Sequence, residues 1–514
     1  MSTPELPDQS GLEESPRELK GTVLRGAGIA SFGFVLTQVL ALGFYLALAR
    51  IATPEDFGEF AAAAIVISTG LMLTESGMLA ALIHRRDRVD EAASTAVIST
   101  AIGGLLFTLI ALGLSPVIAA IFESDRIGSL AAALSGILLV RSLQVVPEAL
   151  LQRRFSFLRR MIVEPVQMIA FGVAAVIATS NGLGAWGLVI GYYAAAVTDV
   201  VLSWALVRWR PRFHLVSFGM WRELIGYGRQ VLASNLVLRA GHQVPVVLIG
   251  RFVGQGPLGQ FRYGERIAST PLALIVSSAA YVVLPAFARI SHDRERFSTA
   301  FLQSLRWFST LAMPMGLILV PLGIPLAVVL FGEVWRDAGE AAMALSVYTV
   351  GAALVSVASE GYKAEGRPEV LVHVHAVTFA VGTVAMVALL PYDLVGVVGG
   401  LSIGLAVGAI YALARVGRML EISAGSLLAQ LWPSALAGLA MAAALLPFDR
   451  LLTEPESHGT AVALLLLGAE GLIGLAIYAV ILILLAPDTI SQVRSLIATA
   501  RRRDGAPAEE VAAT

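Results

Sequence analysis

The chain contains no cysteine, which excludes disulfides, thiolate metal ligands and thiol catalysis. Charge is also scarce, because Asp, Glu, Lys and Arg make up 14% of the 514 residues, against about 25% in a typical soluble domain. Among the basic residues only Lys20 and Lys363 are lysines. The formal net charge of −1 argues against a nucleic-acid partner, since such partners usually select a strong basic excess.

Two motifs that would indicate an enzyme are also missing. The sequence contains neither the zinc-binding pattern HExxH nor the phosphate loop GxxxxGK[ST], so we expect no metalloprotease site and no ATPase site. His373 and His375 are two residues apart on an expected helix and so point to nearly opposite faces, which makes them a poor metal pair. We expect no metal and no cofactor.

Apolar residues are abundant, at 57% of the chain, and a soluble globule of this size could not bury them all. The polar, acidic residues 1–24 do not resemble a secretory signal, so the first apolar run reads as an uncleaved helix. Spans of about 20 residues are needed to cross a bilayer. We predict an all-α integral membrane protein of about fourteen transmembrane helices, at residues 26–48, 58–80, 92–120, 128–148, 162–180, 185–207, 225–249, 264–286, 303–331, 338–360, 369–390, 393–414, 426–447 and 460–486.

The distribution of basic residues predicts the orientation of these helices. Lys and Arg collect in cytoplasmic loops. Counting helix ends with their loops, 26 lie at the N-terminus, the C-terminus and every second loop, and 7 lie in the alternate loops. We therefore expect both termini in the cytoplasm.

Two loops predicted on the outer side share one spacing, which indicates an internal repeat. Arg50, Gly58 and Phe60 follow the first helix, and Arg251, Gly259 and Phe261 follow the seventh at the same intervals. Chance similarity between two short turns is the alternative. A duplicated transporter of two parallel lobes is a known plan. The predicted parts are a cytoplasmic tail (1–24), an N-lobe of helices 1–6 (25–215), a C-lobe of helices 7–12 (216–420), helices 13–14 (421–488) and a cytoplasmic C-terminal tail (489–514).

Ionisable side chains inside membrane helices are costly, and they usually face a cavity or a partner. Along 225–249, polar residues at i, i+4, i+7 and i+8 share one helix face, which we interpret as the wall of a water-filled cavity. Arginine forks suit a phosphate-bearing cargo. The predicted substrate-binding residues are Arg25, Arg141, Asn235, Arg239, His242, Gln243 and Arg266, and the predicted coupling or ion-pair residues are Glu75 and Glu164. The alternative is that these charges only pair with one another and hold helices together.

Two further features predict helix shape rather than transport chemistry. The spacing of Gly400, Gly404 and Gly408 predicts a close-packing face on 393–414. Pro314, Pro321 and Pro325 on 303–331, together with a proline on 264–286, predict kinks.

Short segments across residues 22–420 resemble a known family. They include Pro-Glu-Asp-Phe-Gly at 54–58 and Thr-Glu-Ser-Gly at 74–77, and they lie in residues 52–60, 73–83, 254–263, 284–287, 330–338 and 363–368. Together and in this order they resemble Wzx-like lipid-linked oligosaccharide flippases of the multidrug/oligosaccharidyl-lipid/polysaccharide exporter superfamily. One departure is Pro245, which stands where such proteins often carry an acidic residue, and it puts ion coupling by this helix in doubt.

The resemblance implies a twelve-helix bilobed core with two extra helices, working by alternating access. It implies export of an undecaprenyl-diphosphate-linked sugar repeat unit from the cytoplasmic to the periplasmic leaflet of a bacterial inner membrane, with the polysaccharide polymerase and chain-length machinery as partners. The alternatives are a cation antiporter for drugs or toxins, which would favour an acidic cavity, and a membrane enzyme acting on the same lipid-linked glycan. The short loops argue against the enzyme.

Overall fold

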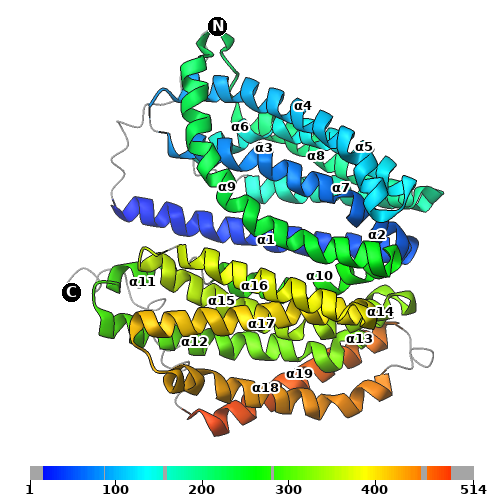
Figure 1. The fold of residues 1–514 in the computed structure, drawn as a ribbon, viewed down its shortest axis with the longest axis vertical. Helices are drawn as coiled ribbons and strands as arrows, with labels where there is room; N and C mark the ends of the chain where they lie inside the picture. The colour runs from blue at the N-terminus through cyan, green and yellow to red at the C-terminus, as the bar shows by residue number, and fades with distance from the viewer. Residues whose placement is uncertain are drawn as a thin grey trace. The chain divides into compact units, whose positions relative to one another are not determined.

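The structure is a computed structural model that describes residues 16–85, 87–153, 159–278, 283–367, 369–452 and 460–487. Every regular element in these residues is a helix, and none of them forms a strand (Figure 1). In parts of several helices the backbone alone is described. The chain divides into two compact units, Met1–Gln243 and Val244–Thr514, which are treated separately below.

Unit 1 is a bundle of helices joined by short connections. Neighbours in sequence pack together, as α4 does with α5 and α7 with α8, and helices distant in sequence also meet, as α1 does with α7 and α5 with α8. Short π-helical turns, η2 (Arg159–Val163) and η3 (Thr179–Leu183), precede and follow α7. The α-helices are α1 (Pro16–Ile51), α2 (Pro54–Ala63), α3 (Ile65–His84), α4 (Val89–Phe122), α5 (Asp125–Ser142), α6 (Val145–Arg153), α7 (Glu164–Ala178), α8 (Ala185–Val207) and α9 (Phe218–Leu248), whose last turns belong to unit 2.

Unit 2 follows the same pattern, with two more helices at its end. Within it α16 and α17 run side by side, and α18 packs against α12 and α19 (Figure 1). The α-helices are α10 (Gln255–Ser278), α11 (Leu284–Ile290), α12 (Arg294–Leu317), α13 (Leu319–Phe331), α14 (Arg336–Ala344), α15 (Ser346–Ala364), α16 (Glu369–Ala388), α17 (Asp393–Leu420), α18 (Ala424–Leu452) and α19 (Thr460–Leu485), with the π-helical turn η5 (Ile249–Val253) and 3₁₀ turns at Glu333–Trp335 and Leu390–Tyr392.

In the part of the chain that the structure describes, the fourteen predicted segments consist mainly of helical residues, but several are broken into two helices. The bends are 40° between α5 and α6, 52° between α12 and α13, and 43° between the Glu333–Ala344 segment and α15. The bend after α12 confirms the kink predicted from Pro314 and Pro321, since proline removes a helical hydrogen bond. The bend between α5 and α6 lies just before Pro147, whose missing N–H leaves the Leu143 carbonyl without its helical partner. The breaks at Ala64 and between α14 and α15 have no such proline, so the apolar pattern could not reveal them.

Among the described residues, fewer helices qualify as membrane spans by length and hydropathy than the fourteen that were predicted. Eight described helices are long and apolar enough to cross a membrane, or up to eleven if each bent pair forms one span. The three predicted segments outside that count are 58–80, 225–249 and 264–286. In the structure the first is divided at Ala64, and the third carries the charged residues Glu265 and Arg266. The count of fourteen therefore remains a prediction.

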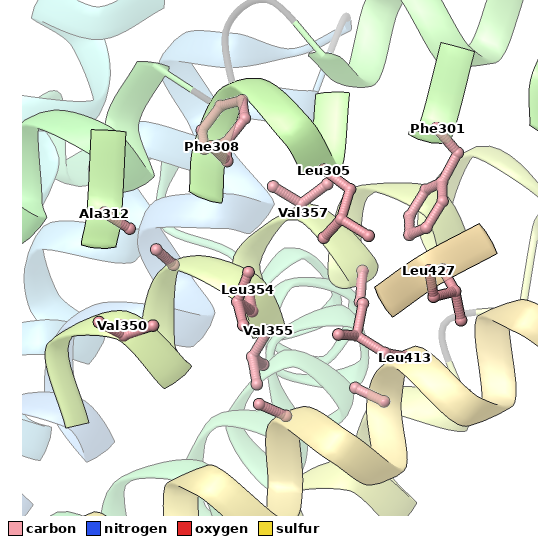
Figure 2. Close-up of a cluster of buried hydrophobic side chains, with 14 of the residues drawn as sticks. Phe301, Leu305, Phe308, Ala312, Val350, Leu354, Val355, Val357, Leu413 and Leu427 are labelled. Carbon is pink, nitrogen blue, oxygen red and sulfur yellow. The ribbon is translucent and has the colours of Figure 1, made fainter. Parts of the chain in front are cut away.

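The apolar side chains are distributed as expected for a protein dissolved in lipid. Large apolar residues such as Val384, Leu465 and Leu484 are exposed on the outer faces of their helices, where the hydrocarbon of a bilayer is an equally apolar solvent. The core of unit 2 forms where α12, α15 and α17 meet α18. Phe301, Leu305 and other side chains from these helices interlock there (Figure 2).

The predicted close-packing face on α17 is confirmed. A methyl group placed on Gly404 would lie 2.4 Å from the Cα atom of Gly382, and one on Gly400 would lie 2.4 Å from the backbone nitrogen of Met386. Both neighbours are on α16, so the absence of side chains allows the two backbones to approach.

The first of the two repeated loops begins α2 and ties three helix starts of unit 1 together. Thr53 and Asp56 form a capping box, in which the Asp56 N–H donates to Thr53 Oγ1 (3.2 Å) and the Thr53 N–H donates to Asp56 Oδ2 (3.1 Å). Asp56 Oδ1 also accepts from the N–H of Ala185 at the start of α8 (3.0 Å). Arg126, in the first turn of α5, contacts Asp56 (3.4 Å) and Glu59 (3.0 Å).

The second repeated loop begins α10, and its first helical residue, Gln255, matches Pro54 in the repeat. Gln260, which matches Glu59, is buried. Its Nε2 donates to the carbonyl of Val334 (2.6 Å), and its Oε1 accepts from the N–H of Ala338 (3.0 Å) near the start of α14. In both units this repeated position therefore contacts the start of a later helix, α5 or α14. The contact is an ion pair in unit 1 and a pair of neutral hydrogen bonds in unit 2.

Candidate functional site

The break between α5 and α6 carries Arg141, one of the predicted substrate-binding residues. Arg141 is half-buried in the last turn of α5. Gln144, in the break, is buried, and its Nε2 donates to Glu148 Oε2 (3.2 Å). Its Oε1 atom is buried without a hydrogen-bond partner among the described residues. A buried open acceptor beside an arginine at a helix break fits a hydrated cavity wall, and it also fits a strained helix junction.

Glu164 begins α7, directly after the π-helical turn η2, and its side chain is half-buried. Gln167 lies three residues later on the same face, and its Oε1 is buried without a hydrogen-bond partner in the described part of the chain. Because α7 packs against α1 and α8, these polar groups lie within the bundle of unit 1. Single π-helical turns often occur at functional sites.

His242 and Gln243 are the described members of the predicted polar stripe on α9. His242 is exposed, whereas Gln243 is half-buried and donates from Nε2 to Ser68 Oγ on α3 (2.8 Å). Gln243 thus links two helices of unit 1. This agrees with the alternative to a cavity wall, in which polar residues hold neighbouring helices together. The role of the stripe in binding remains a prediction.

Arg266 lies in unit 2, half-buried on α10. Its backbone carbonyl accepts from Thr270 Oγ1 (2.8 Å), and one turn earlier Arg262 pairs with Glu265 (2.9 Å). The structure therefore divides the predicted site residues between the units, with Arg141, Glu164, His242 and Gln243 in unit 1.

The remaining predicted residues lie outside the described side chains. Arg25 falls on α1, Glu75 on α3, and Asn235 and Arg239 on α9, where the backbone is helical. Their binding and coupling roles remain predictions.

Two buried carboxylates outside the predicted site make short local contacts. Asp199 on α8 is fully buried and accepts from Ser203 Oγ (3.2 Å), and Glu360 on α15 accepts from Lys363 Nζ (2.9 Å). The spacings i, i+4 and i, i+3 place each pair on one helix face, so the sequence pattern could have indicated both contacts. Both arrangements match the structural alternative, in which a buried charge is stabilised by its neighbour.

A family model described as polysaccharide biosynthesis protein matches residues 47–340, more than half of the chain. The chain belongs to this family. Among similar members, the succinoglycan biosynthesis transport protein ExoT of Rhizobium meliloti (strain 1021) is 26% identical over 63% of this chain and 63% of its own length. The teichuronic acid biosynthesis protein TuaB of Bacillus subtilis (strain 168) is 26% identical over 58% of this chain and 62% of its own length. The chain thus spans 63% and 62% of the lengths of these relatives.

Solved structures establish the fold of this polysaccharide biosynthesis protein. The lipid II flippase MurJ in its inward closed conformation aligns with a TM-score of 0.71 at 16% identity, over 90% of this chain and 99% of MurJ. An inward-facing multidrug resistance transporter of the MATE family and MOP superfamily aligns with a TM-score of 0.59 at 18% identity, over 76% of this chain and 96% of the transporter.

These likenesses confirm the resemblance drawn from the sequence. The family member has a MurJ-like and MATE-like fold, and its apolar helices make it a multi-pass membrane protein. ExoT and the two structural neighbours are named as a transport protein, a flippase and a transporter, and none of them is named as an enzyme.

Proposed function

We propose that this protein is a flippase for a lipid-linked glycan. The observation that carries the proposal is the MurJ-like fold, which covers 90% of this chain, in a member of the polysaccharide biosynthesis protein family. A fold alone does not determine function, and the family supplies the class of pathway. The likeness to the MATE transporter covers less of the chain and has the lower TM-score, so it supports an antiporter less well.

The finer proposal is export of undecaprenyl-diphosphate-linked repeat units from the cytoplasmic to the periplasmic leaflet of a bacterial inner membrane. Two six-helix lobes (25–215 and 216–420) would alternate in access, and residues 421–488 would add two helices. The polysaccharide polymerase and chain-length machinery would then act on the delivered units.

The sugar-diphosphate head would be received by arginines within the membrane helices, namely Arg25, Arg141, Arg239 and Arg266. Guanidinium groups remain charged and bind oxyanions with two parallel hydrogen bonds, which supports a phosphate-bearing cargo. Among the acidic residues, Glu75 would couple an ion or pair with one of these arginines. The half-buried position of Arg141 beside the open acceptor of Gln144 supports this proposal.

The first test is the sidedness of lipid-linked oligosaccharides in a strain that lacks the gene. We expect undecaprenyl-diphosphate-linked intermediates to accumulate on the cytoplasmic leaflet of right-side-out vesicles, and the intact gene should restore export. If the intermediates reach the outer leaflet but stay unpolymerised, the protein acts after transport and the flippase proposal is wrong.

The topology can be tested directly because the chain contains no cysteine. Single cysteines would replace Asp87 and Glu421 in predicted cytoplasmic loops and Tyr392 in a predicted outer loop; all three positions are exposed. An impermeant maleimide applied to intact spheroplasts should label Tyr392→Cys alone, and permeabilisation should expose the other two. Labelling of Asp87→Cys without permeabilisation would contradict the orientation.

The role of Arg239 can be separated from folding by two substitutions. We expect Arg239→Ala to abolish most export at normal protein levels, and Arg239→Lys to retain part of it because the charge remains. Arg222→Ala, at an exposed position on the same helix, is the matched control. Intact export by Arg239→Ala would remove this residue from the proposed site.

A further inference from the structure

Two adjoining cavities open among the helix ends of unit 2, at the end that the charge pattern predicts to be cytoplasmic. One has a volume of about 370 Å³ and the other about 170 Å³. They share Arg367, Arg418 and Met419 in their walls, and Arg415 lines the smaller one. The arginines come from the turn between α15 and α16 and from the last turns of α17. We call this pair of cavities the basic pocket.

The charges around the basic pocket are not balanced. Arg294, at the start of α12, is paired with Glu421 (3.3 Å). Arg367, Arg415 and Arg418 make no ion pair and no side-chain hydrogen bond within the part of the chain that the structure describes. Glu365 is the carboxylate among the residues that line the larger cavity. These three arginines therefore share the walls of the basic pocket with a single carboxylate among the described residues, Glu365.

The backbone that presents these arginines is held firmly in place. Tyr362 is a buried residue that lines the smaller cavity, and its hydroxyl donates to the carbonyl of Ala412 (2.6 Å) and so fixes α15 against α17. The N–H of Arg367 donates to the carbonyl of Tyr362 (2.9 Å), which fixes the turn after α15. Arg415 and Arg418 are three residues apart and project from one face of α17.

A purely structural reading explains part of this cluster. Cations near the end of α17 are favoured by the helix dipole. That effect does not explain the third arginine, Arg367, which comes from a different element and lines the same cavities. Like charges brought together repel one another, so the arrangement is more stable with an anion bound between them.

We propose that the basic pocket binds a phosphate-bearing anion, through the guanidinium groups of Arg367, Arg415 and Arg418. Guanidinium forks match the geometry of phosphate oxygens and bind them bidentately. The phosphate belongs either to the headgroup of an anionic membrane lipid or to a soluble phosphate compound. This site lies within unit 2 and is independent of the arginines assigned above to transport, so it stands whether or not the protein is a flippase.

The test is the thermal unfolding midpoint of the purified full-length chain in detergent, titrated with two probes. One probe is sodium diphosphate, compared with sodium chloride at equal ionic strength. The other is phosphatidylglycerol in mixed micelles, compared with phosphatidylcholine. The pocket variant is Arg415→Gln/Arg418→Gln. The matched control is Arg208→Gln/Arg210→Gln, which removes two exposed arginines from unit 1 on the same predicted side.

We expect at least one probe to raise the midpoint of the unmodified chain and of the control. The pocket variant should need roughly a tenfold or higher probe concentration for the same effect, since hydrogen bonds to charged groups are lost. A response to diphosphate alone identifies a soluble ligand, and a response to phosphatidylglycerol alone identifies a lipid headgroup. Equal responses of the pocket variant and the unmodified chain overturn the proposal. If the pocket variant fails to fold, Arg367→Gln, in an exposed turn, takes its place.

Discussion

The loop before α2 in unit 1 and the loop before α10 in unit 2 have the same spacing of residues and begin their helices at matching positions. In unit 1, Glu59 meets Arg126 at the start of α5 through an ion pair that is partly open to solvent. In unit 2, the buried Gln260 meets the backbone of Val334 and Ala338 through two neutral hydrogen bonds. The repeat thus preserves the place of a contact between helices and not its chemistry.

The residues that precede the two helices, Thr53 and Gly254, also differ in backbone conformation and in capping. Thr53 has an extended backbone (φ −87°) and caps α2 with its side chain. Gly254, at the matching position, has φ +133° and ψ 172°, a conformation that is essentially restricted to glycine. A threonine could not cap α10 from that backbone. A shared sequence spacing therefore indicates a shared fold position, and it does not transfer the local hydrogen bonds.

The largest effect is expected from Gln260→Leu. This change leaves the buried Ala338 N–H without a partner and removes the partly buried hydrogen bond to the Val334 carbonyl, which together should destabilise the protein by roughly 2–4 kcal/mol. The thermal unfolding midpoint in detergent measures the loss. Gln303→Leu, at an exposed position on α12, is the matched control and should change little. Equal midpoints for the two variants would contradict the buried amide contact.

Exchange of the two residues that precede the helices should be asymmetric. Gly254→Thr forces a β-branched residue into the glycine conformation and should cost about 1–3 kcal/mol. Thr53→Gly keeps an accessible backbone and should cost only a few tenths of a kcal/mol. The same unfolding measurement compares the two variants. If Gly254→Thr proves as mild as Thr53→Gly, the difference between the loops is smaller than the structure indicates.

The sequence predicted the helices well because their main signal, long apolar runs, is local. It did not predict breaks such as those at Ala64 or at the junction of α14 and α15, because these breaks carry no local signal and depend on packing against neighbouring helices. Proline marked one break in advance, the bend after α12. The sequence also predicted the glycine face of α17, because the three-residue gaps between its glycines are a local pattern.

The sequence predicted the candidate site less well than it predicted the helices, for a physical reason. Periodicity shows that Asn235, Arg239, His242 and Gln243 share part of one helix face, and it does not show what that face touches. The structure gives Gln243 a partner on α3, Ser68, which no pattern within α9 could indicate. The basic pocket was likewise hidden, because Arg367 joins Arg415 and Arg418 only through the packing of α15 against α17.

A smaller effect is expected from Glu59→Gln in unit 1. Arg126 is half-exposed, so water and salt screen its pair with Glu59, and the loss should be about 1 kcal/mol or less. The unfolding midpoint of the variant should depend less on salt concentration than that of the unmodified chain. A loss as large as that of Gln260→Leu would mean that the two units rely on this position equally, and the contrast between charged and neutral contacts would fail.

A second ionic contact in unit 1 joins the start of α9 to Arg85, the residue that follows α3. Arg85 Nη1 donates to Glu223 Oε2 (2.7 Å), and Arg88 lies 3.5 Å from the same carboxylate. This hydrogen bond from Arg85, helped by the charges of Arg85 and Arg88, holds the pKa of Glu223 below its ordinary value of 4.5. The folded chain therefore binds fewer protons here than the unfolded chain at acidic pH.

The smallest predicted effect is the pH dependence that follows from this pair. Its contribution to stability is fully present above the ordinary pKa of 4.5 and is lost as pH falls through the lower pKa of the folded state. The unfolding midpoints of the unmodified chain and of Glu223→Gln should therefore differ by a constant amount above pH 4.5 and converge as the pH is lowered from 4.5 to about 3. Arg85→Gln should behave like Glu223→Gln, and combining the two changes should add little, because both remove one interaction. A constant difference between Glu223→Gln and the unmodified chain down to this acidic range would show that the carboxylate acts through packing rather than charge, and this contact would then no longer count among the ion pairs of unit 1.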